Sequence, residues 1–171
     1  TLHEAFGIED GLLTTIHAYT GSQPTLDRGN KKWERGRAAA LSMVPTTTGA
    51  AKAVGLVLPE LNGRLNGVAI RVPTPNVSCV DFKFNTTKPI TIDTVNTALS
   101  NAANGPMQGI LGLEPMPVVS IDLNHDPRSA IVATAETQVQ GRMGRVLAWY
   151  DNEWGFSNRM ADTAVEMGRF L

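Results

Sequence analysis

Runs of β-branched and apolar residues follow one another too closely along this chain for helices to connect most of them. The stiff link Pro73–Asn76, only four residues long, separates two of these runs. A crossover between parallel strands needs about a dozen residues or more, so runs this close together must pair mainly antiparallel. The predicted strands are 12–18, 67–72, 77–84, 118–123, 129–134 and 145–150. The sequence therefore predicts an α+β fold, with a mostly antiparallel or mixed sheet and helices packed on one face.

Caps and periodicity predict the helices. Residues 1–7 are typical of the last turns of a helix that ends at Gly7, and a helix is expected over 50–58, before Pro59. Thr91 is the expected N-cap of a helix whose apolar residues follow the helical period: Val95, Ala98, Leu99 and Ala102. A last helix is expected from about Ser157, with its apolar side buried: Met160, Ala161, Ala164, Val165 and Met167. Because the chain begins inside a helix, we expect it to be part of a longer protein.

Composition restricts the classes of protein that this chain can belong to. At 171 residues it is long enough for one domain with one core, and its formal net charge is −1. We therefore expect no binding to nucleic acid or to a membrane surface. No apolar run approaches the roughly 18 residues of a membrane span. The single cysteine excludes an internal disulfide and favours a reducing, cytoplasmic location.

A histidine followed by a polar arm is the first candidate for chemistry. His17 ends a β-branched run, and residues 19–37 are mostly polar, with four arginines or lysines before Arg37. An arm of this length exceeds the roughly 12–15 residues of an ordinary structureless loop, so it is either functional or disordered. His17 itself is either a general base or a satisfied structural side chain. His3 and His125 are expected to be structural or exposed, and the dispersed histidines argue against a metal site.

The segment Pro45–Gly49 precedes a predicted helix and is the second candidate. Free backbone N–H groups and the positive end of the helix dipole suit a phosphate or sulfate there. The alternative is a plain N-cap by Thr47 or Thr48. Arginine matches phosphate in a bidentate manner, and the chain supplies several that could take part: Arg28, Arg35, Arg37 and Arg71. Arg71 lies inside an apolar run, so it is either paired with an anion or directed to solvent.

The segment 149–159 is rich in aromatic and amide side chains. It is either a packed strand-to-helix corner or a platform for a planar ring, with Asn152 able to hydrogen-bond a carboxamide. No Gly-x-Gly-x-x-Gly motif follows a strand, so the sequence shows no dinucleotide-binding fingerprint of that kind.

Taken together, these segments resemble phosphorylating glyceraldehyde-3-phosphate dehydrogenase, specifically its C-terminal catalytic domain. Four matches in the order and spacing of that family establish the resemblance, which extends over essentially the whole chain. They are Thr15–Thr20 (TIHAYT), Pro45–Val54 (PTTTGAAKAV), Arg71–Ser78 (RVPTPNVS) and Trp149–Glu153 (WYDNE).

The resemblance implies a catalytic role for His17. It matches the base that takes the proton from a cysteine thiol, whose thiolate attacks the aldehyde of the substrate. The pocket for the attacking inorganic phosphate is matched by Arg35, Thr48 and Gly49. The pocket for the phosphate of glyceraldehyde 3-phosphate is matched by Thr20 and Arg71.

The resemblance also implies a cofactor and an assembly. The cofactor is NAD or NADP, and Asn152 matches the residue that holds the nicotinamide carboxamide, with Phe156 beside the ring. The arm 19–37 matches a loop that packs beside a cofactor in a neighbouring subunit of a homotetramer. Residues 1–171 would then form the catalytic, substrate-binding and oligomerisation domain, without the N-terminal dinucleotide-binding domain of the family.

Three departures from the family pattern alter these expectations. The catalytic cysteine of the family lies upstream of Thr1, and Cys79 stands in a strand where an aliphatic residue is usual, so we expect it to be buried and unreactive. Ser22 replaces an acidic residue found near the substrate phosphate in many members. Phe156 replaces a tyrosine.

Two functions remain open at this point. The first is the catalytic domain of an NAD(P)-dependent glyceraldehyde-3-phosphate dehydrogenase, inactive when it lacks its nucleophile; erythrose-4-phosphate dehydrogenase is a less favoured relative. The second is a non-catalytic module for oligomerisation or phosphate binding that derives from the same domain.

Overall fold

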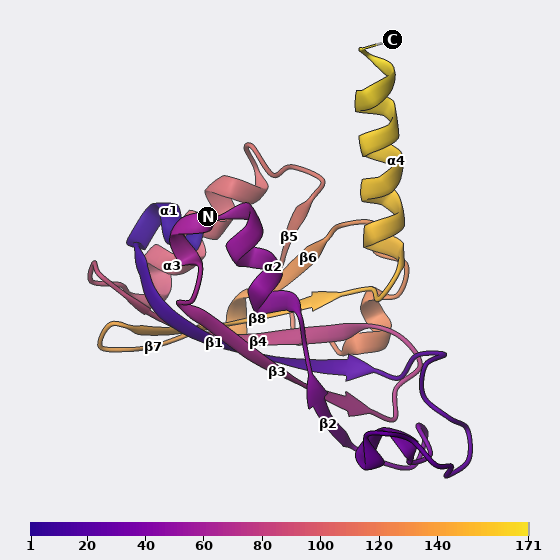
Figure 1. Ribbon diagram of the computed structural model, residues 1–171. Coiled ribbons are helices and arrows are strands. Elements are labelled where there is room, and N and C mark those ends of the chain that lie inside the picture. The colour runs from indigo at the N-terminus through magenta and orange to yellow at the C-terminus, as the bar shows by residue number, and fades with distance from the viewer. Residues whose placement is uncertain (171) are drawn as a thin grey trace.

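The strands form one eight-stranded mixed sheet in the computed structural model, which describes residues 1–170 (Figure 1). Their order is β2-β3-β1-β4-β8-β6-β5, and β7 pairs with β8 off this path. The strands are β1 (Ile8–Ala18), β2 (Val44–Thr47), β3 (Leu65–Val72), β4 (Ser78–Thr86), β5 (Leu111–Glu114), β6 (Ala130–Ala133), β7 (Gln138–Gln140) and β8 (Met143–Tyr150). The predicted α+β fold with a mixed sheet is confirmed.

Strands that follow one another in the chain are not always neighbours in the sheet, since β3 and β4 both flank β1 and do not pair with each other. The short link after β3 leads into β4, which pairs antiparallel with β1, and β8 pairs antiparallel with β4. β1 and β3 are parallel neighbours, because residues 19–64 lie between them and provide the crossover. This parallel pair brings the carboxyl ends of β1 and β3 to the same edge of the sheet.

Three helices cover one face of the sheet, as Figure 1 shows: α1 (Leu2–Phe6), α2 (Ala50–Val57) and α3 (Ile92–Ala103). Gly7 ends α1 in the left-handed conformation, and Thr91 Oγ1 accepts a hydrogen bond from the Thr94 backbone at the start of α3. Both caps were predicted. The main core lies between these helices and the sheet and includes Phe6, Phe84, Val95, Leu99 and Val146.

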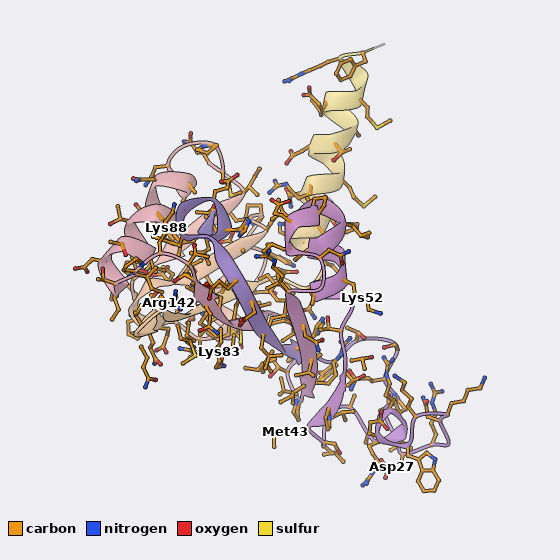
Figure 2. All side chains as sticks on the ribbon, turned by 60° about the vertical axis from the view of Figure 1, so that its left-hand side comes forward. Asp27, Met43, Lys52, Lys83, Lys88 and Arg142 are labelled. Atoms are coloured by element: carbon orange, nitrogen blue, oxygen red, sulfur yellow. The ribbon has the colours of Figure 1, made fainter. Side chains whose placement is uncertain are left out.

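On the opposite face of the sheet, apolar side chains are exposed in the chain by itself. Leu12 of β1 is 50% exposed and Val68 of β3 is 46% exposed. Ile16 and Ile70 follow on the same two strands and are half-buried. The arm that follows β1, marked by Asp27 in Figure 2, projects away from the end of the molecule that holds Lys88 and Arg142.

The last helix, α4 (Trp154–Gly168), stands clear of the other elements (Figure 1). The expected burial of its apolar side is wrong in this chain, since Met160, Val165 and Met167 are 58–65% exposed and Ala161 and Ala164 are exposed as well. The helical period was recognised correctly, but residues 1–170 supply no surface that packs against this apolar side. No helix among residues 1–170 is long and apolar enough to cross a membrane.

One predicted strand is wrong, and three short strands were missed. Residues 118–123 do not form a strand but end in the 3-10 helix η3 (Ser120–Leu123), because Asp122 accepts a hydrogen bond from the Val119 backbone and turns the chain. The missed strands β2, β5 and β7 are three or four residues long. Runs of that length show no periodicity, and only pairing with neighbours makes them strands.

Candidate functional site

Two basic side chains meet where β1 and β3 end. His17 and Arg71 are direct partners in the parallel register of these strands. Arg71 Nη1 lies 2.9 Å from His17 Nδ1 and 3.0 Å from the carbonyl oxygen of Ala18. His17 Nδ1 lies 2.7 Å from the same oxygen. Strand pairing thus builds a contact between residues that are 54 positions apart in the sequence.

The surroundings of His17 keep it neutral. Burial lowers its pKa, the hydrogen bond with the Ala18 carbonyl opposes this, and the positive charge of Arg71 lowers it further, so that the net shift is downward. The ring packs edge-on against Tyr150, with 6.1 Å between ring centroids. A neutral, half-buried imidazole can accept a proton, so this environment suits a general base.

Arg71 is the centre of a positively charged cluster. Its Nη1 lies 3.5 Å from Thr20 Oγ1, which in turn lies 3.0 Å from Ser22 Oγ. Burial and the nearby charge of Arg35 lower the pKa of Arg71. Within residues 1–170 no carboxylate pairs with Arg71 or Arg35, and the buried Arg71 Nε has no hydrogen-bond partner. The cluster therefore keeps the charge and the free donors that an anion requires.

Thr48 and Gly49 do not touch this cluster. β2 runs antiparallel to β3, and Thr47 lies opposite Val68, three residues before Arg71. Gly49 is the N-cap residue of α2, and Thr48 Oγ1 accepts a hydrogen bond from the Ala50 backbone at 3.2 Å, so neither predicted N-cap threonine occupies that position. These two residues form a separate, exposed helix start.

The other predicted arginines of the arm are not gathered at the cluster. Arg37 Nε donates to Asp27 Oδ2 at 2.9 Å, and Asp27 Oδ1 accepts from the Ala38 backbone, which folds the arm back on itself. A short 3-10 helix, η1 (Trp33–Gly36), places Arg35 near Arg71. The arm is thus ordered by its own contacts, and of the predicted arginines only Arg35 joins Arg71.

Asn152 is linked to β1 through a buried serine. Ser78 Oγ accepts a hydrogen bond from the Ala18 backbone at 3.1 Å and donates to Asn152 Oδ1 at 2.5 Å. The amide oxygen of Asn152 is therefore held, and its Nδ2 makes no hydrogen bond within residues 1–170. A free amide donor matches the carboxamide oxygen of a nicotinamide, so the residue fits the cofactor implied by the resemblance.

A carboxylate that sequence reasoning missed organises this corner. Asp151 is 4% exposed and accepts hydrogen bonds from the backbones of His125, Glu153 and Trp154 and from Asn76 Nδ2. Burial opposes ionisation, but these donors together lower the pKa of Asp151. His125, one of these donors, has a positive φ angle of 63°, and Val77, next to the donor Asn76, has one of 64°. The available signal was an acidic residue just before the last predicted helix.

The aromatic residues Trp154 and Phe156 do not share one environment. Trp154 stacks on His125, with 4.9 Å between ring centroids, as the packed-corner alternative required. Phe156, in the first turn of α4, is 68% exposed and is free to face a planar ring. The packed-corner arrangement is therefore present at Trp154, and a ring platform at Phe156 stays a prediction.

Cys79 is not placed to act with His17. It lies opposite Ile16, so the pleat directs it to the other face of the sheet from His17. Burial, with a contribution from Asp81, raises the pKa of the Cys79 thiol to about 11. The expected buried cysteine is confirmed at 5% exposure. Within residues 1–170 no group of three or more potential ligands is placed to hold a metal ion.

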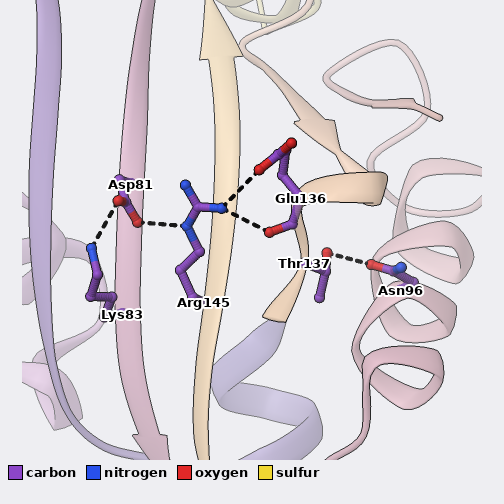
Figure 3. Close-up of polar contacts among 6 residues, drawn as sticks. All are labelled: Asp81, Lys83, Asn96, Glu136, Thr137 and Arg145. Atoms are coloured by element: carbon purple, nitrogen blue, oxygen red, sulfur yellow. Dashed lines mark hydrogen bonds and ion pairs between the residues drawn. The ribbon is translucent and has the colours of Figure 1, made fainter. Parts of the chain in front are cut away.

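Another cavity lies away from this site. It has a volume of about 760 Å³ and is bordered by β4, β7 and β8. Figure 3 shows its charged wall, in which Arg145 bridges Asp81 and Glu136 and Lys83 contacts Asp81. These charges neutralise one another, in contrast to the uncompensated cluster around Arg71.

Comparisons with known proteins point to a single family. A family model described as the C-terminal domain of glyceraldehyde 3-phosphate dehydrogenase matches residues 1–152. A glyceraldehyde-3-phosphate dehydrogenase of Cereibacter sphaeroides is 63% identical over 171 residues, which cover 99% of this chain and 51% of that protein. One of Xanthobacter flavus is 59% identical over 98% of this chain and 50% of its own length.

A more distant relative comes from a plastid. Glyceraldehyde-3-phosphate dehydrogenase A, chloroplastic, of Chlamydomonas reinhardtii is 52% identical over 95% of this chain and 44% of its own length. The chain thus spans about half the length of the curated relatives it matches.

Proposed function

Since the chain belongs to the glyceraldehyde-3-phosphate dehydrogenase family and matches its C-terminal domain, we propose that it is the catalytic domain of such an enzyme. The proposed reaction oxidises glyceraldehyde 3-phosphate with NAD or NADP and inorganic phosphate to 1,3-bisphosphoglycerate. The observation that supports it best is the neutral His17 beside Arg71, an arginine without a carboxylate partner. A base next to an anion pocket is what a phosphorylated aldehyde requires.

His17 is proposed as the base. It would take the proton from a cysteine thiol, and the thiolate would add to the aldehyde carbon. That thiol must come from a segment other than β4, because Cys79 faces away from His17 and is protonated at neutral pH. The protonated His17 would stabilise the thiolate and give its proton to the oxyanion that forms on addition. The neutral His17 would then accept that proton back as the hydride leaves, so that a thioester forms.

The two predicted anion pockets have separate proposed roles. Arg71 and Thr20 would hold the phosphate of the substrate, and Arg35, Thr48 and Gly49 would hold the attacking inorganic phosphate. The buried Arg71 Nε, which has no hydrogen-bond partner, supports the first pocket, and the open space at Gly49 supports the second. Arg35 lies near Arg71, so it would have to serve the second pocket from beside the first. The attacking phosphate oxygen forms a bond to the thioester carbon as the thiolate leaves, so the acyl phosphate is released and the thiolate is regenerated.

Asn152 and Phe156 are proposed to orient the cofactor. The bound oxidised nicotinamide would supply the hydride acceptor, with its carboxamide on Asn152 and its ring near Phe156. The amide of Asn152 is fixed by Ser78, and the exposed ring of Phe156 is free to make this contact. The arm 19–37 is proposed to lie beside a cofactor of a neighbouring subunit.

The native state is proposed to be a cytoplasmic homotetramer. The open sheet face around Leu12 and Val68 supports association between subunits, since apolar side chains there are uncovered in the chain by itself. The exposed apolar side of α4 likewise supports contact with further protein.

The decisive experiment replaces the base in the native protein. We expect phosphate-dependent formation of reduced nicotinamide from glyceraldehyde 3-phosphate, with kcat in His17→Gln about 10²–10⁴-fold lower. His125→Gln is the matched control and should retain activity. An unaltered protein without this activity, or a His17→Gln variant with full activity, would contradict the proposal. The 171-residue chain alone is expected to be inactive.

A non-catalytic phosphate-binding or oligomerisation module is the second candidate. The observation in its favour is that the charged cluster is present while the cysteine of the chain is unsuited to catalysis. It would be upheld if the native protein bound phosphate, lost that binding in Arg71→Ala and showed no dehydrogenase activity.

A further inference from the structure

Three atoms at the carboxyl ends of β1 and β3 lie close together but cannot all hydrogen-bond to one another at the same time. Arg71 Nη1, His17 Nδ1 and the Ala18 carbonyl oxygen are mutually within 2.7–3.0 Å. A guanidinium nitrogen only donates hydrogen bonds, and a carbonyl oxygen only accepts them. His17 Nδ1 lies between the two and can satisfy only one of them, depending on whether it carries a proton.

Each choice defines a state of the site. With Nδ1 bare, it accepts from Arg71, the proton of the neutral ring is on Nε2, and Arg71 also satisfies the Ala18 carbonyl. With Nδ1 protonated, it donates to the Ala18 carbonyl, and Arg71 must withdraw because its N–H groups would meet the N–H of the ring. The carbonyl is satisfied in both states, so the exchange leaves no buried acceptor unpaired.

The two states differ in their chemistry. A neutral histidine with its proton on Nδ1 offers a bare Nε2, which can accept a proton from another group. With its proton on Nε2, the outward nitrogen is a donor and cannot act as a base. Within residues 1–170 Nε2 has no hydrogen-bond partner that would fix its state. The position of Arg71 therefore decides whether the outward nitrogen is a base.

Arg71 is free to move toward an anion. Its Nη1 already lies 3.5 Å from Thr20 Oγ1, and its buried Nε has no partner. The groups that face His17 are Arg71 on β3, Ser78 on β4 and Tyr150 on β8, with Arg35 on η1 behind Arg71. Burial raises the pKa of Tyr150, so the phenol is neutral and the charges at the site are positive.

We infer that Arg71 controls which nitrogen of His17 carries the proton, and that an anion bound by Arg71 and Thr20 releases this control. Arg71 is then a positioning residue for the base as well as an anion ligand. This inference rests on the proposed function, in which the anion is the substrate phosphate. Binding of the phosphorylated substrate would thus convert His17 into a base only when there is a substrate to process.

The test follows the protonation of His17 directly. Exchange of the imidazole C2 hydrogen for deuterium, measured by mass spectrometry of peptides from the native protein, gives a titration midpoint for each histidine. Added inorganic phosphate should raise the midpoint of His17, because the anion offsets the charge of Arg71 and frees Nδ1 to donate. His3 and His125 should not respond, and sodium chloride at matched ionic strength should have no effect on His17.

Three variants separate the possible causes. Arg71→Gln should raise the midpoint of His17 without phosphate and abolish the response to it. Thr20→Val should leave the phosphate-free midpoint unchanged and require more phosphate for the same shift. Arg142→Gln, an arginine at the far end of the sheet, is the matched control and should behave like the unaltered protein.

The outcomes bear differently on the two proposals. A phosphate-insensitive midpoint in the unaltered protein, or one that still responds in Arg71→Gln, would overturn control by Arg71. If such a protein is an active dehydrogenase, the proposed function stands. A phosphate-sensitive midpoint in a protein without dehydrogenase activity would uphold control by Arg71 and overturn the proposed reaction.

Discussion

Ser22 determines how much positive charge the Arg71 cluster retains. Its hydroxyl contacts Thr20 without adding a negative charge. In Ser22→Asp a carboxylate would compete with phosphate for Arg71, and we expect the Kd for inorganic phosphate to rise about fivefold, or about 1 kcal/mol. Isothermal titration measures the change. Ser22→Asn, which has the shape of Asp without its charge, should cost much less; equal losses in the two variants would contradict a charge effect.

Cys79 is expected to be chemically silent in the folded protein. With a pKa of about 11, roughly one thiol in a thousand is ionised at pH 8. We expect iodoacetamide to label Cys79 at least about a hundredfold faster in urea than in buffer, because unfolding removes the burial. Peptide mass spectrometry identifies the site, and Cys79→Ala serves as the blank. Equal rates in urea and buffer would show that the thiol is accessible.

Asp151 joins three elements, and its loss should affect all of them. It accepts from the first turn of α4, from the turn at His125 and from Asn76 beside the start of β4. We expect Asp151→Ala to lower the free energy of unfolding by about 3 kcal/mol, since buried donors lose their acceptor. Urea unfolding measures the loss. Asp93→Asn, in the exposed first turn of α3, should change stability by less than about 0.5 kcal/mol.

Gly155, in the first turn of α4, lies close to the backbone of Arg128. A Cβ there would lie 2.7 Å from the backbone oxygen of Arg128. We therefore expect Gly155→Ala to destabilise the protein by about 1–3 kcal/mol, although alanine favours helices. Gly168→Ala, near the end of the same helix, meets no atom within 4 Å and should be neutral or stabilising. Similar effects of the two substitutions on urea unfolding would contradict a steric role for Gly155.

Local signals predicted the helices far better than the short strands. Gly7 and Thr91 act through their own backbone and near neighbours, so the sequence states where α1 ends and α3 begins. β5 and β7 depend on β6 and β8, and no pattern within three or four residues reveals a pairing partner. Asp122 turned a predicted strand into η3 through one side-chain hydrogen bond.

The arrangement of the site could not be predicted from the sequence for a similar reason. His17 and Arg71 could each be singled out, His17 from its place at a strand end and Arg71 from its apolar surroundings. Their contact requires the parallel pairing of β1 with β3, which no local signal announces. The resemblance implied a separate role for each, His17 as the base and Arg71 in a phosphate pocket, and both roles stay predictions. Neither approach predicted the hydrogen bonds around Asp151. Most of its donors are backbone N–H groups, and only the folded chain brings them together.

The uncovered sheet face should govern association. Leu12 of β1 is 50% exposed on this face. We expect Leu12→Lys to weaken self-association at least about tenfold, because a charge would be desolvated in the contact. Sedimentation velocity measures the assembly. Met116→Lys, at a 63% exposed position outside this face, is the control and should assemble normally. An unchanged sedimentation coefficient for Leu12→Lys would exclude this face as a contact.

The parallel pairing of β1 with β3 also has a kinetic consequence. Fifty-four positions separate His17 from Arg71, so their meeting requires closure of a long loop, which is slow compared with formation of a local turn. The helices can form earlier from nearby residues. A chain still leaving the ribosome, or one halted on the way to its native state, therefore has neither the base nor its arginine partner in place. The proposed affinity for phosphate would then report completed folding.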